Sequence, residues 1–312
     1  MMTGGADRRG VLAGLGSLGL MGCKPAPSKQ VVPETKDNPL PMAIREPAWT
    51  PALDLSSLEA RHGGRIGVTA LEANHYPVVW RQADRFVYCS TFKMYLAAAT
   101  LLRVQAGDEQ LGRLIPITAA DMVTHAPVTQ PAVGRSLSVE TLMQAVVEVS
   151  DNPAANLLLK ASGGLGAMQA FYRGIGDDTT RVDRFEPEMN RLDGDKDTIT
   201  PFQSAANIHR LLLGATTPLF PASKEKLLGW MFSSPTGAAR IKAGVPAGWR
   251  VAHKTGTGGY GPTNDIGVLY PPTGEPVTLA IYYHGVRASS PEQNEAVIAE
   301  ATRMTLSALG YA

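Results

Sequence analysis

The sequence predicts an α+β fold in two parts, with a sheet made from both ends of the chain and a helical region inserted between them. Short runs rich in β-branched and aromatic residues occur at 64–71 and 77–81, and three more occur only at 249–257, 264–270 and 276–283. A helical pattern over 291–309 follows the last of them. The stretch between the two sets has helical periodicity punctuated by glycine and proline, so we expect a cleft where the two parts meet.

Composition indicates an ordinary globular protein. The chain has 312 residues, of which 44% are hydrophobic and 18% charged, with a formal net charge of +1. This length and hydrophobic content are sufficient for a core shared by two subdomains. The nearly neutral charge gives no reason to expect nucleic acid as a partner. We expect one domain over residues 50–312, with an α/β part at 50–85 and 231–312 and a helical part at 86–230. A small substrate, no protein partner and a monomer fit this composition best.

Residues 1–23 have the pattern of an export signal. Paired arginines precede an apolar segment at 11–21 that is too short to span a bilayer as a mature helix. The arginines favour the twin-arginine route, with the general secretory route as the alternative. Residues 20–23 resemble a bacterial lipobox, in which Cys23 would be lipidated, and the proline-rich residues 24–49 read as an extended tether. We therefore expect a periplasmic or otherwise exported bacterial protein, lipid-anchored if Cys23 is modified.

The remaining cysteine and the histidines give little support to redox or metal chemistry. The sequence has two cysteines, so Cys89 has no partner in the mature domain if Cys23 lies in the signal. Cys89 is interpreted as a small buried hydrophobe. The six histidines are scattered without a close pair, which argues against a metal site. No cofactor is expected.

Ser90 and Lys93 open the most apolar helical segment, residues 90–102. A helix that is apolar on nearly every side belongs inside a domain, so its first turn places both side chains at a buried junction and on one face. A desolvated lysine can take the proton of a hydroxyl and activate it as a nucleophile. The same spacing at Ser223 and Lys226 lies among charges and is interpreted as a capped, solvated helix start.

A second polar motif, Ser150 to Asn152, separates the helical pattern at 139–149 from the one that begins with Pro153. Taken alone, it is interpreted as a helix cap made by Asp151 or Asn152. As a site, Ser150 could carry a proton and Asn152 could orient an amide.

A third motif contains Glu186 and Asn190, in a polar stretch at 174–201 with little periodicity. Long loops of this kind are often functional. The proline after Glu186 allows a cis peptide that would set the direction of the carboxylate, and Asn190 could share a water with it. Arg184 and Asp197 could pin the loop closed by their opposite charges. The alternative is that these carboxylates form a solvated face.

A fourth motif, Lys254 to Gly261, closes the β run that begins at Trp249. Glycine in a strand often marks the close approach of a ligand, and hydroxyls beside a lysine suit a carboxylate. Arg240 would supply a second positive charge. The alternative is a glycine-rich hairpin turn.

In this order, the motifs S-x-x-K, S-D-N, E-P-E-x-N and K-T-G resemble the pattern of class A serine β-lactamases. Intervals of 60, 36 and 68 residues separate Ser90, Ser150, Glu186 and Lys254, and they agree with the usual spacing of the family. The likeness covers nearly the whole mature domain. It implies a β-lactamase/transpeptidase-like fold, with an antiparallel five-stranded sheet flanked by helices from both chain ends and an inserted all-α subdomain.

The resemblance also implies a reaction, the hydrolysis of the lactam amide of penicillins and cephalosporins through an acyl-enzyme on Ser90, and hence antibiotic resistance. Lys93, or Glu186 through a water, would take the proton of Ser90, and this choice stays open. Ser150 would protonate the departing nitrogen, and Glu186 with Asn190 would activate the deacylating water. The backbone amides of Ser90 and Thr257 would form the oxyanion hole. The residues implied to bind substrate are Asn152, Lys254, Thr255, Gly256, Thr257, Arg240 and His125.

Some positions depart from the family pattern. His125 stands where an aromatic residue usually flanks the cleft, and His253 stands where aspartate is more usual. Cys89 resembles that of members active on carbapenems, but their disulfide partner is absent, so carbapenem turnover is not implied. A penicillin-binding D,D-peptidase and a β-lactam sensor domain remain alternatives, although the presence of Glu186 and Asn190 favours the hydrolase.

Overall fold

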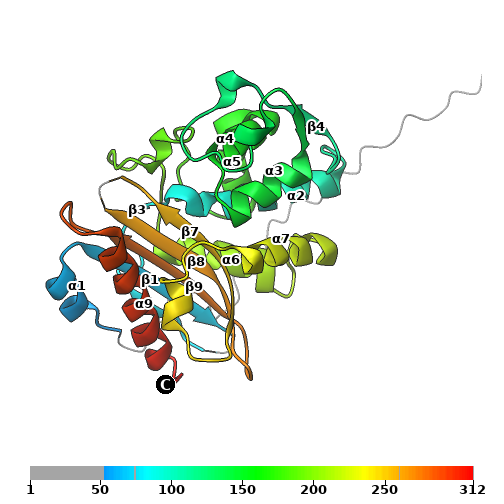
Figure 1. Ribbon diagram of the computed structural model, residues 1–312. Helices are drawn as coiled ribbons and strands as arrows, with labels where there is room; N and C mark the ends of the chain where they lie inside the picture. Colours follow the sequence, from blue (N-terminus) through cyan, green and yellow to red (C-terminus); the bar gives the residue numbers. More distant parts are fainter. Residues whose placement is uncertain (1–52, 74, 260, 312) are drawn as a thin grey trace, which may run out of the picture. The chain divides into compact units, whose positions relative to one another are not determined.

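The computed structural model describes residues 53–73, 75–259 and 261–311, so the predicted export signal at 1–23 and tether at 24–49 lie outside the described residues. A five-stranded antiparallel sheet has the order β2-β1-β9-β8-β7. Its strands come from both ends of the domain, which confirms the predicted α+β arrangement (Figure 1). The strands are β1 Arg65–Glu72, β2 Val78–Trp80, β7 Arg250–Thr257, β8 Pro262–Tyr270 and β9 Val277–His284.

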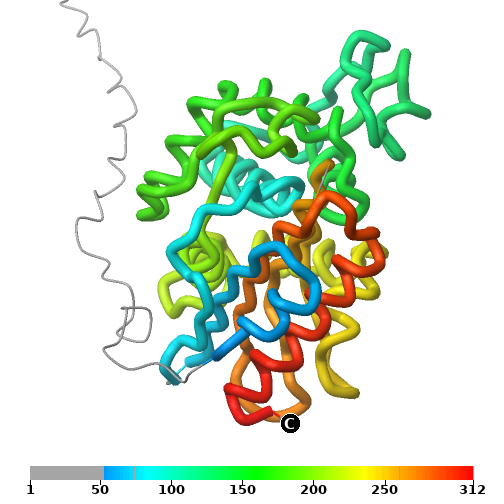
Figure 2. Tube along the Cα trace, turned by 90° about the vertical axis from the view of Figure 1, so that its left-hand side faces the viewer, coloured from blue at the N-terminus to red at the C-terminus, as the bar shows by residue number. Residues whose placement is uncertain are grey.

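A hydrophobic core covers each face of the sheet, because successive side chains of a strand point to opposite sides. Val68 of β1 and Ile281 of β9 pack in one core with Val297 of α9. Ala280 and Tyr282 of β9 belong to the other core. Helix α9 lies beside α1, the first described helix, so the two ends of the described chain meet on one face (Figure 2). The helices of this face are α1 Ser56–His62, α8 Ile241–Gly244 and α9 Pro291–Ala308.

The second core belongs to the helical part. Helix α6 lies against β1, β8 and β9, and helix α2 is contacted by α3, α4, α5 and α7. Most residues of α2 are buried, as predicted for a helix that is apolar on nearly every side. The helices of this part are α2 Phe92–Ala106, α3 Val139–Glu148, α4 Asn152–Ala161, α5 Gly164–Gly174, α6 Pro201–Ile208 and α7 Pro221–Ser233.

Short elements tie the loops of the helical part to its helices. The pairing of β3 with β6 joins the end of the polar loop at 174–201 to the segment before Ser90. The short strands are β3 Phe86–Val87, β4 Leu114–Pro116, β5 Ser136–Ser138 and β6 Thr198–Ile199. The single turns are η2 Cys89–Thr91, η3 Ala119–Asp121, η4 Gln130–Ala132 and η5 Glu188–Asn190, and a π-helical segment, η6, spans His209–Leu213. Within the ranges given above, none of the helices is long and apolar enough to cross a membrane.

Gly67 of β1 packs where the two parts of the fold meet, and we expect any side chain there to destabilise the protein. An added Cβ would overlap the ring of Phe86 and lie 2.6 Å from Cγ of Pro201, and both neighbours are rigid. We expect Gly67→Ala to lower the free energy of unfolding by about 1–3 kcal/mol, measured by urea denaturation.

The matched control for this change is Gly166→Ala in α5, where no atom lies within 4 Å of the added Cβ. It should leave stability unchanged or raise it slightly, because alanine favours the helix over glycine. Equal stabilities of the two variants would contradict the packing argument.

Candidate active site

Ser90 lies in the single turn η2, directly before α2, so the helix begins two residues later than the sequence pattern predicted. The turn is fastened to the sheet from β8, where Nδ2 of Asn264 donates to the carbonyl oxygens of Val87 at 2.9 Å and Tyr88 at 3.1 Å. Cys89 has φ +49° and is buried and free, as expected for a small hydrophobe. These constraints hold Ser90 at the junction between sheet and helix.

Lys93, in the first turn of α2, is fully buried and connects the motifs that the sequence singled out. Its Nζ lies 3.0 Å from Oγ of Ser90 and 3.0 Å from Oε1 of Glu186. The same atom donates to the Ser150 carbonyl oxygen at 2.8 Å and to Oδ1 of Asn152. Burial lowers the pKa of Lys93, and the Glu186 carboxylate opposes that shift. A lysine in this position can exchange a proton with either neighbour.

Glu186 is buried and held in place from two sides. Nδ2 of Asn190 donates directly to its Oε2, where the sequence had suggested a shared water. From α4, the side chain of Asn156 donates to the Glu186 carbonyl oxygen at 2.9 Å and accepts from its amide at 3.0 Å. The peptide between Glu186 and Pro187 is cis, as the sequence allowed. These contacts contradict the alternative of a solvated face for Glu186, whereas Glu188 is exposed as that alternative expected.

The ends of the polar loop are pinned by Asp197, as expected. Its carboxylate accepts from the backbone amide of Asp183 at 2.8 Å and from Nε of Arg184 at 2.5 Å. It also accepts from the hydroxyl of Tyr88, next to the turn that carries Ser90. The loop that carries Glu186 is thereby joined to the segment that carries Ser90.

The Ser150 to Asn152 motif combines a cap with site residues. Asp151 caps α4 by accepting from the amide of Ala154 at 2.9 Å, which confirms the predicted cap. Ser150 has φ +62°, and Nδ2 of Asn152 donates to the carbonyl oxygen of Thr124 at 2.7 Å. The backbone of His125 accepts from the Asn152 amide, while its ring Nε2 donates to the Val149 carbonyl oxygen. These two hydrogen bonds hold His125 next to Asn152, at the rim of the site.

Two buried lysines share the hydroxyl of Ser150. Nζ of Lys254 lies 3.2 Å from that oxygen, and Nζ of Lys93 lies 3.4 Å from it. The pKa of Lys254 is held well below its ordinary value by burial and by the charge of Lys93, and Asp265 opposes the shift. Asp265 itself accepts from Nδ1 of His253 at 2.9 Å, in a pair with no solvent exposure. Ser150 is thus placed to receive a proton from either lysine.

The K-T-G strand lies tight against the serine turn. A Cβ on Gly256 would lie 2.7 Å from the Tyr88 carbonyl oxygen and 3.1 Å from the Thr91 amide nitrogen, so only glycine fits. Behind the strand, Nη2 of Arg240 donates to the hydroxyl of Thr257 at 2.7 Å. The hydroxyl of Thr255 is hydrogen-bonded to that of Thr236 at 2.9 Å. The strand thereby presents hydroxyls backed by a buried guanidinium, and Lys254 to Thr257 lie in a regular β ladder. Gly258 and Gly259 lie in the tight connection from β7 to the antiparallel strand β8, so the motif contains both a strand and the glycine-rich hairpin turn that the sequence offered as the alternative.

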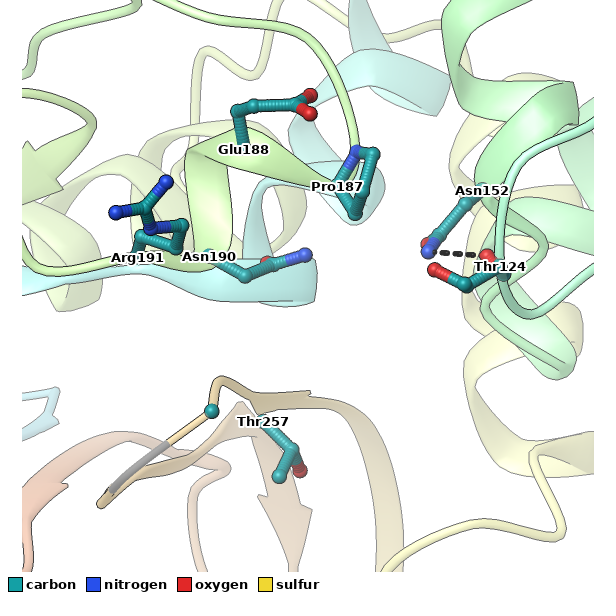
Figure 3. Close-up of a pocket in the computed structure, with 8 residues that line it drawn as sticks. Thr124, Asn152, Pro187, Glu188, Asn190, Arg191 and Thr257 are labelled. Carbon is teal, nitrogen blue, oxygen red and sulfur yellow. Dashed lines mark hydrogen bonds between the residues drawn. The ribbon is translucent and has the colours of Figure 1, made fainter.

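A cavity of about 360 Å³ opens between the polar loop, α4 and the end of β7. Figure 3 shows Asn152 and Thr124 on one side of it, the loop residues on another, and Thr257 across from them. Asn152, which lines this cavity, accepts a hydrogen bond from Lys93, and Lys93 in turn donates to Ser90. Among the lining residues, Thr124 and Arg191 lie outside the four motifs, while Pro187, Glu188 and Gly259 lie within them but were not named as substrate-binding residues.

Two supporting residues also escaped the sequence analysis. Asn156 holds Glu186, and Asn264 holds the turn before Ser90. The signal for Asn156 was present, since it is a lone amide in the otherwise apolar helical run 153–159, four residues after Asn152. Nothing local distinguishes Asn264 from other polar residues of a strand. Among the described side chains, no group of three or more His, Cys, Asp or Glu is placed to hold a metal.

Comparisons with known proteins agree on one family. A family model described as the β-lactamase enzyme family matches residues 51–309. The chain is 40% identical over 265 residues to β-lactamase L2 of Stenotrophomonas maltophilia, covering 84% of this chain and 87% of that one. An ancestral (GNCA) class A β-lactamase structure has 46% identity and a TM-score of 0.78, covering 81% of this chain and 98% of that one.

A crystal structure of a β-lactamase from Xanthomonas campestris is 40% identical, with a TM-score of 0.78, and the match covers 82% of this chain and 96% of that one. Matches of this length and identity show common descent over the whole domain. They agree with the five-stranded sheet and the inserted helical part described above. The chain therefore belongs to the β-lactamase enzyme family, as a member of its class A.

Proposed function

We propose that this protein hydrolyses the lactam amide of penicillins and cephalosporins, with Ser90 as the nucleophile. Family membership supports lactam hydrolysis and the antibiotic resistance that follows from it. The observation that supports the assignment of roles is the position of Lys93, which touches Ser90, Ser150, Asn152 and Glu186 at once. One buried amine thus contacts three of the groups that move protons in the proposed reaction, Ser90, Ser150 and Glu186.

In the acylation step, Oγ of Ser90 attacks the lactam carbonyl carbon and loses its proton. Lys93 takes that proton when neutral, or Glu186 takes it through a water, and the short contacts of Lys93 to both residues support either route. The carbon–nitrogen bond then breaks, and the nitrogen receives the proton of Ser150. Lys254 or Lys93 returns a proton to Ser150, since both lie within hydrogen-bonding distance of its oxygen.

In the deacylation step, Glu186 takes a proton from a water while the oxygen of that water attacks the ester carbonyl. Ser90 leaves and recovers its proton, so the net change is the addition of one water across the amide. Asn190 orients the carboxylate of Glu186, and the backbone contacts of Asn156 fix the position of the residue. The burial of Glu186 and its fixed direction support this role over that of a surface carboxylate.

Substrate binding is assigned to the two sides of the cavity. Asn152 and the rim residue His125 face the acyl side chain of the substrate, while Lys254, Thr255 and Thr257 bind its carboxylate. Arg240 strengthens that end of the site through its hydrogen bond to Thr257. Gly256 lets the strand approach Ser90 closely enough for the amides of Ser90 and Thr257 to stabilise the oxyanion.

The first prediction concerns turnover of a chromogenic cephalosporin in large excess over enzyme. We expect sustained hydrolysis that is abolished in Ser90→Ala. Glu186→Ala should stall as a covalent adduct visible by mass spectrometry, with deacylation slowed by about 10²–10⁴-fold because the general base is missing.

The matched control is Ser223→Ala, which changes the serine of the other S-x-x-K spacing, in the first turn of α7, and should keep full activity. A burst of one equivalent followed by silence in the parent protein would instead indicate a penicillin-binding peptidase or a sensor domain. Absence of both a burst and sustained hydrolysis would rule out all three.

The second prediction concerns the stability cost of Lys254. Its lowered pKa means that burial disfavours the charged form, so the unfolded chain binds more protons than the folded protein between the folded pKa and about 10.4. Stability of the parent should therefore rise with pH across this window. Lys254→Met should raise the free energy of unfolding by about 1 kcal/mol at pH 7, and its advantage should shrink toward pH 10.

This prediction is tested by thermal unfolding of both proteins between pH 6 and 10. The same variant should lose at least about tenfold in kcat/KM, because a charge-assisted hydrogen bond to the substrate is removed. A gain in stability that is constant over the whole pH range would show that desolvation of the Lys254 charge is not its cause.

We also propose that the protein is exported and carries a lipid on Cys23, with residues 24–49 as a tether between the membrane and a monomeric domain. The supporting pattern is the apolar segment after Arg8 and Arg9 and the small residue before Cys23. Palmitate labelling in growing cells should be lost in Cys23→Ser and retained in Cys89→Ser. Labelling that persists in Cys23→Ser would refute the lipid anchor.

A further inference from the structure

A second cavity, of about 270 Å³, lies in the helical part, between α2, α4 and α5. Figure 1 shows these three helices gathered above the sheet. None of its lining residues belongs to the cavity described above, and Leu102 lies about 13 Å along the axis of α2 from Lys93, at a rise of about 1.5 Å per residue. The lining residues are Leu96, Ala99, Leu102, Arg103, Ala106, Asp108, Leu159, Ser162, Ala167, Met168 and Phe171.

The walls of this cavity are mostly apolar and continuous with the main core. Leu159 and Met168 are buried, while Ala99, Leu102 and Phe171 are only partly buried although they pack against the core. Apolar surface that is left partly open in this way favours a ligand that would cover it. A cavity of about 150 Å³ already admits a benzene-sized molecule, so the space here suits a short hydrocarbon chain or a single ring.

Arg103 is the one cationic side chain among the residues that line this cavity. It lies in the last turn of α2, and its Nη2 donates to the Asp108 carbonyl oxygen at 3.2 Å. Its Nε is buried and has no hydrogen-bond partner among the described residues. The neighbouring carboxylate of Glu109 is already paired with Arg113, and the side chain of Asp108 is exposed.

Guanidinium groups bind carboxylates through parallel hydrogen bonds. We propose that this cavity binds a small apolar carboxylate, with its hydrocarbon part between α2, α4 and α5 and its carboxylate on Arg103. The apolar wall determines the body of the ligand, and Arg103, the one cationic side chain among the lining residues, determines its polar end. The site is independent of the lactam cavity and of the reaction proposed for it.

The test uses octanoate as the probe and 1-octanol as its uncharged counterpart, titrated into the purified protein and followed by backbone NMR. We expect saturable binding of octanoate, with the largest shifts at Leu102 and Phe171. Arg103→Met should weaken octanoate binding about tenfold or more, because the charge-assisted hydrogen bond is lost, and should change 1-octanol binding by less than about twofold. Ala167→Leu, which fills the cavity, should weaken both.

The matched control is Arg135→Met, since Arg135 is an exposed arginine that also donates to a backbone carbonyl, that of Pro131, and it should leave octanoate binding unchanged. If Arg103→Met fails to fold, Arg103→Lys keeps the charge but lacks Nε and should still weaken octanoate binding severalfold. Absence of saturable binding, equal losses for octanoate and octanol, or shifts centred on Ser150 and Thr257 would each overturn the proposal.

Discussion

The burial of Lys93 is the constraint on which the rest of this structure depends. An amine removed from water needs hydrogen-bond acceptors around it, and here they come from three separate stretches of chain: Ser90, the motif that contains Ser150 and Asn152, and Glu186. Each acceptor fixes the position of the loop or helix end that carries it. The same contacts that make the burial tolerable therefore assemble the site.

The second buried lysine, Lys254, lowers the stability of the folded protein. Lys93 and Lys254 both lie within hydrogen-bonding distance of the hydroxyl of Ser150, and the charge of Lys93 disfavours the charged form of Lys254. No local compensation removes this repulsion, because the carboxylates of Glu186 and Asp265 only oppose it in part. The burial of apolar side chains in the two hydrophobic cores, one on each side of the sheet, offsets the free energy that is lost by burying these charges.

Much of the fold and of the site could be predicted from the sequence, because the decisive signals are local. Apolar periodicity predicted α2, the short β-rich runs predicted all five strands of the sheet, and Asp151 was recognisable as a cap. The supporting contacts were not predictable, because they join residues far apart in the chain. Asn264 reaches a carbonyl 177 positions away, and no pattern around it indicates that partner.

Arg240 is a residue whose presence near the site was predicted but whose side-chain direction was not. Its charge was expected in the cleft, yet its guanidinium is spent behind β7 on the carbonyl oxygens of Gly256 and Asn264 and on the carboxylate of Glu295. The hydrogen bond to the Thr257 hydroxyl is the contact through which the guanidinium acts on the substrate-binding strand. The type of residue predicts that a positive charge is needed near the strand, but the direction of the side chain depends on which backbone acceptors the sheet leaves within reach.

The polarity of α2 completes the physical account of the site. Its amino-terminal end, with the positive pole of the helix dipole, lies at the turn that carries Ser90, where negative charge develops as the carbonyl is attacked. The same pole disfavours a permanent cation at Lys93 and favours an anion beside it, which suits an amine that gives up and takes back a proton. Burying this helix centrally among its neighbours also keeps water from screening its field. Because α2 excludes water, it both forms the centre of the helical core and keeps the field of its dipole strong at Ser90.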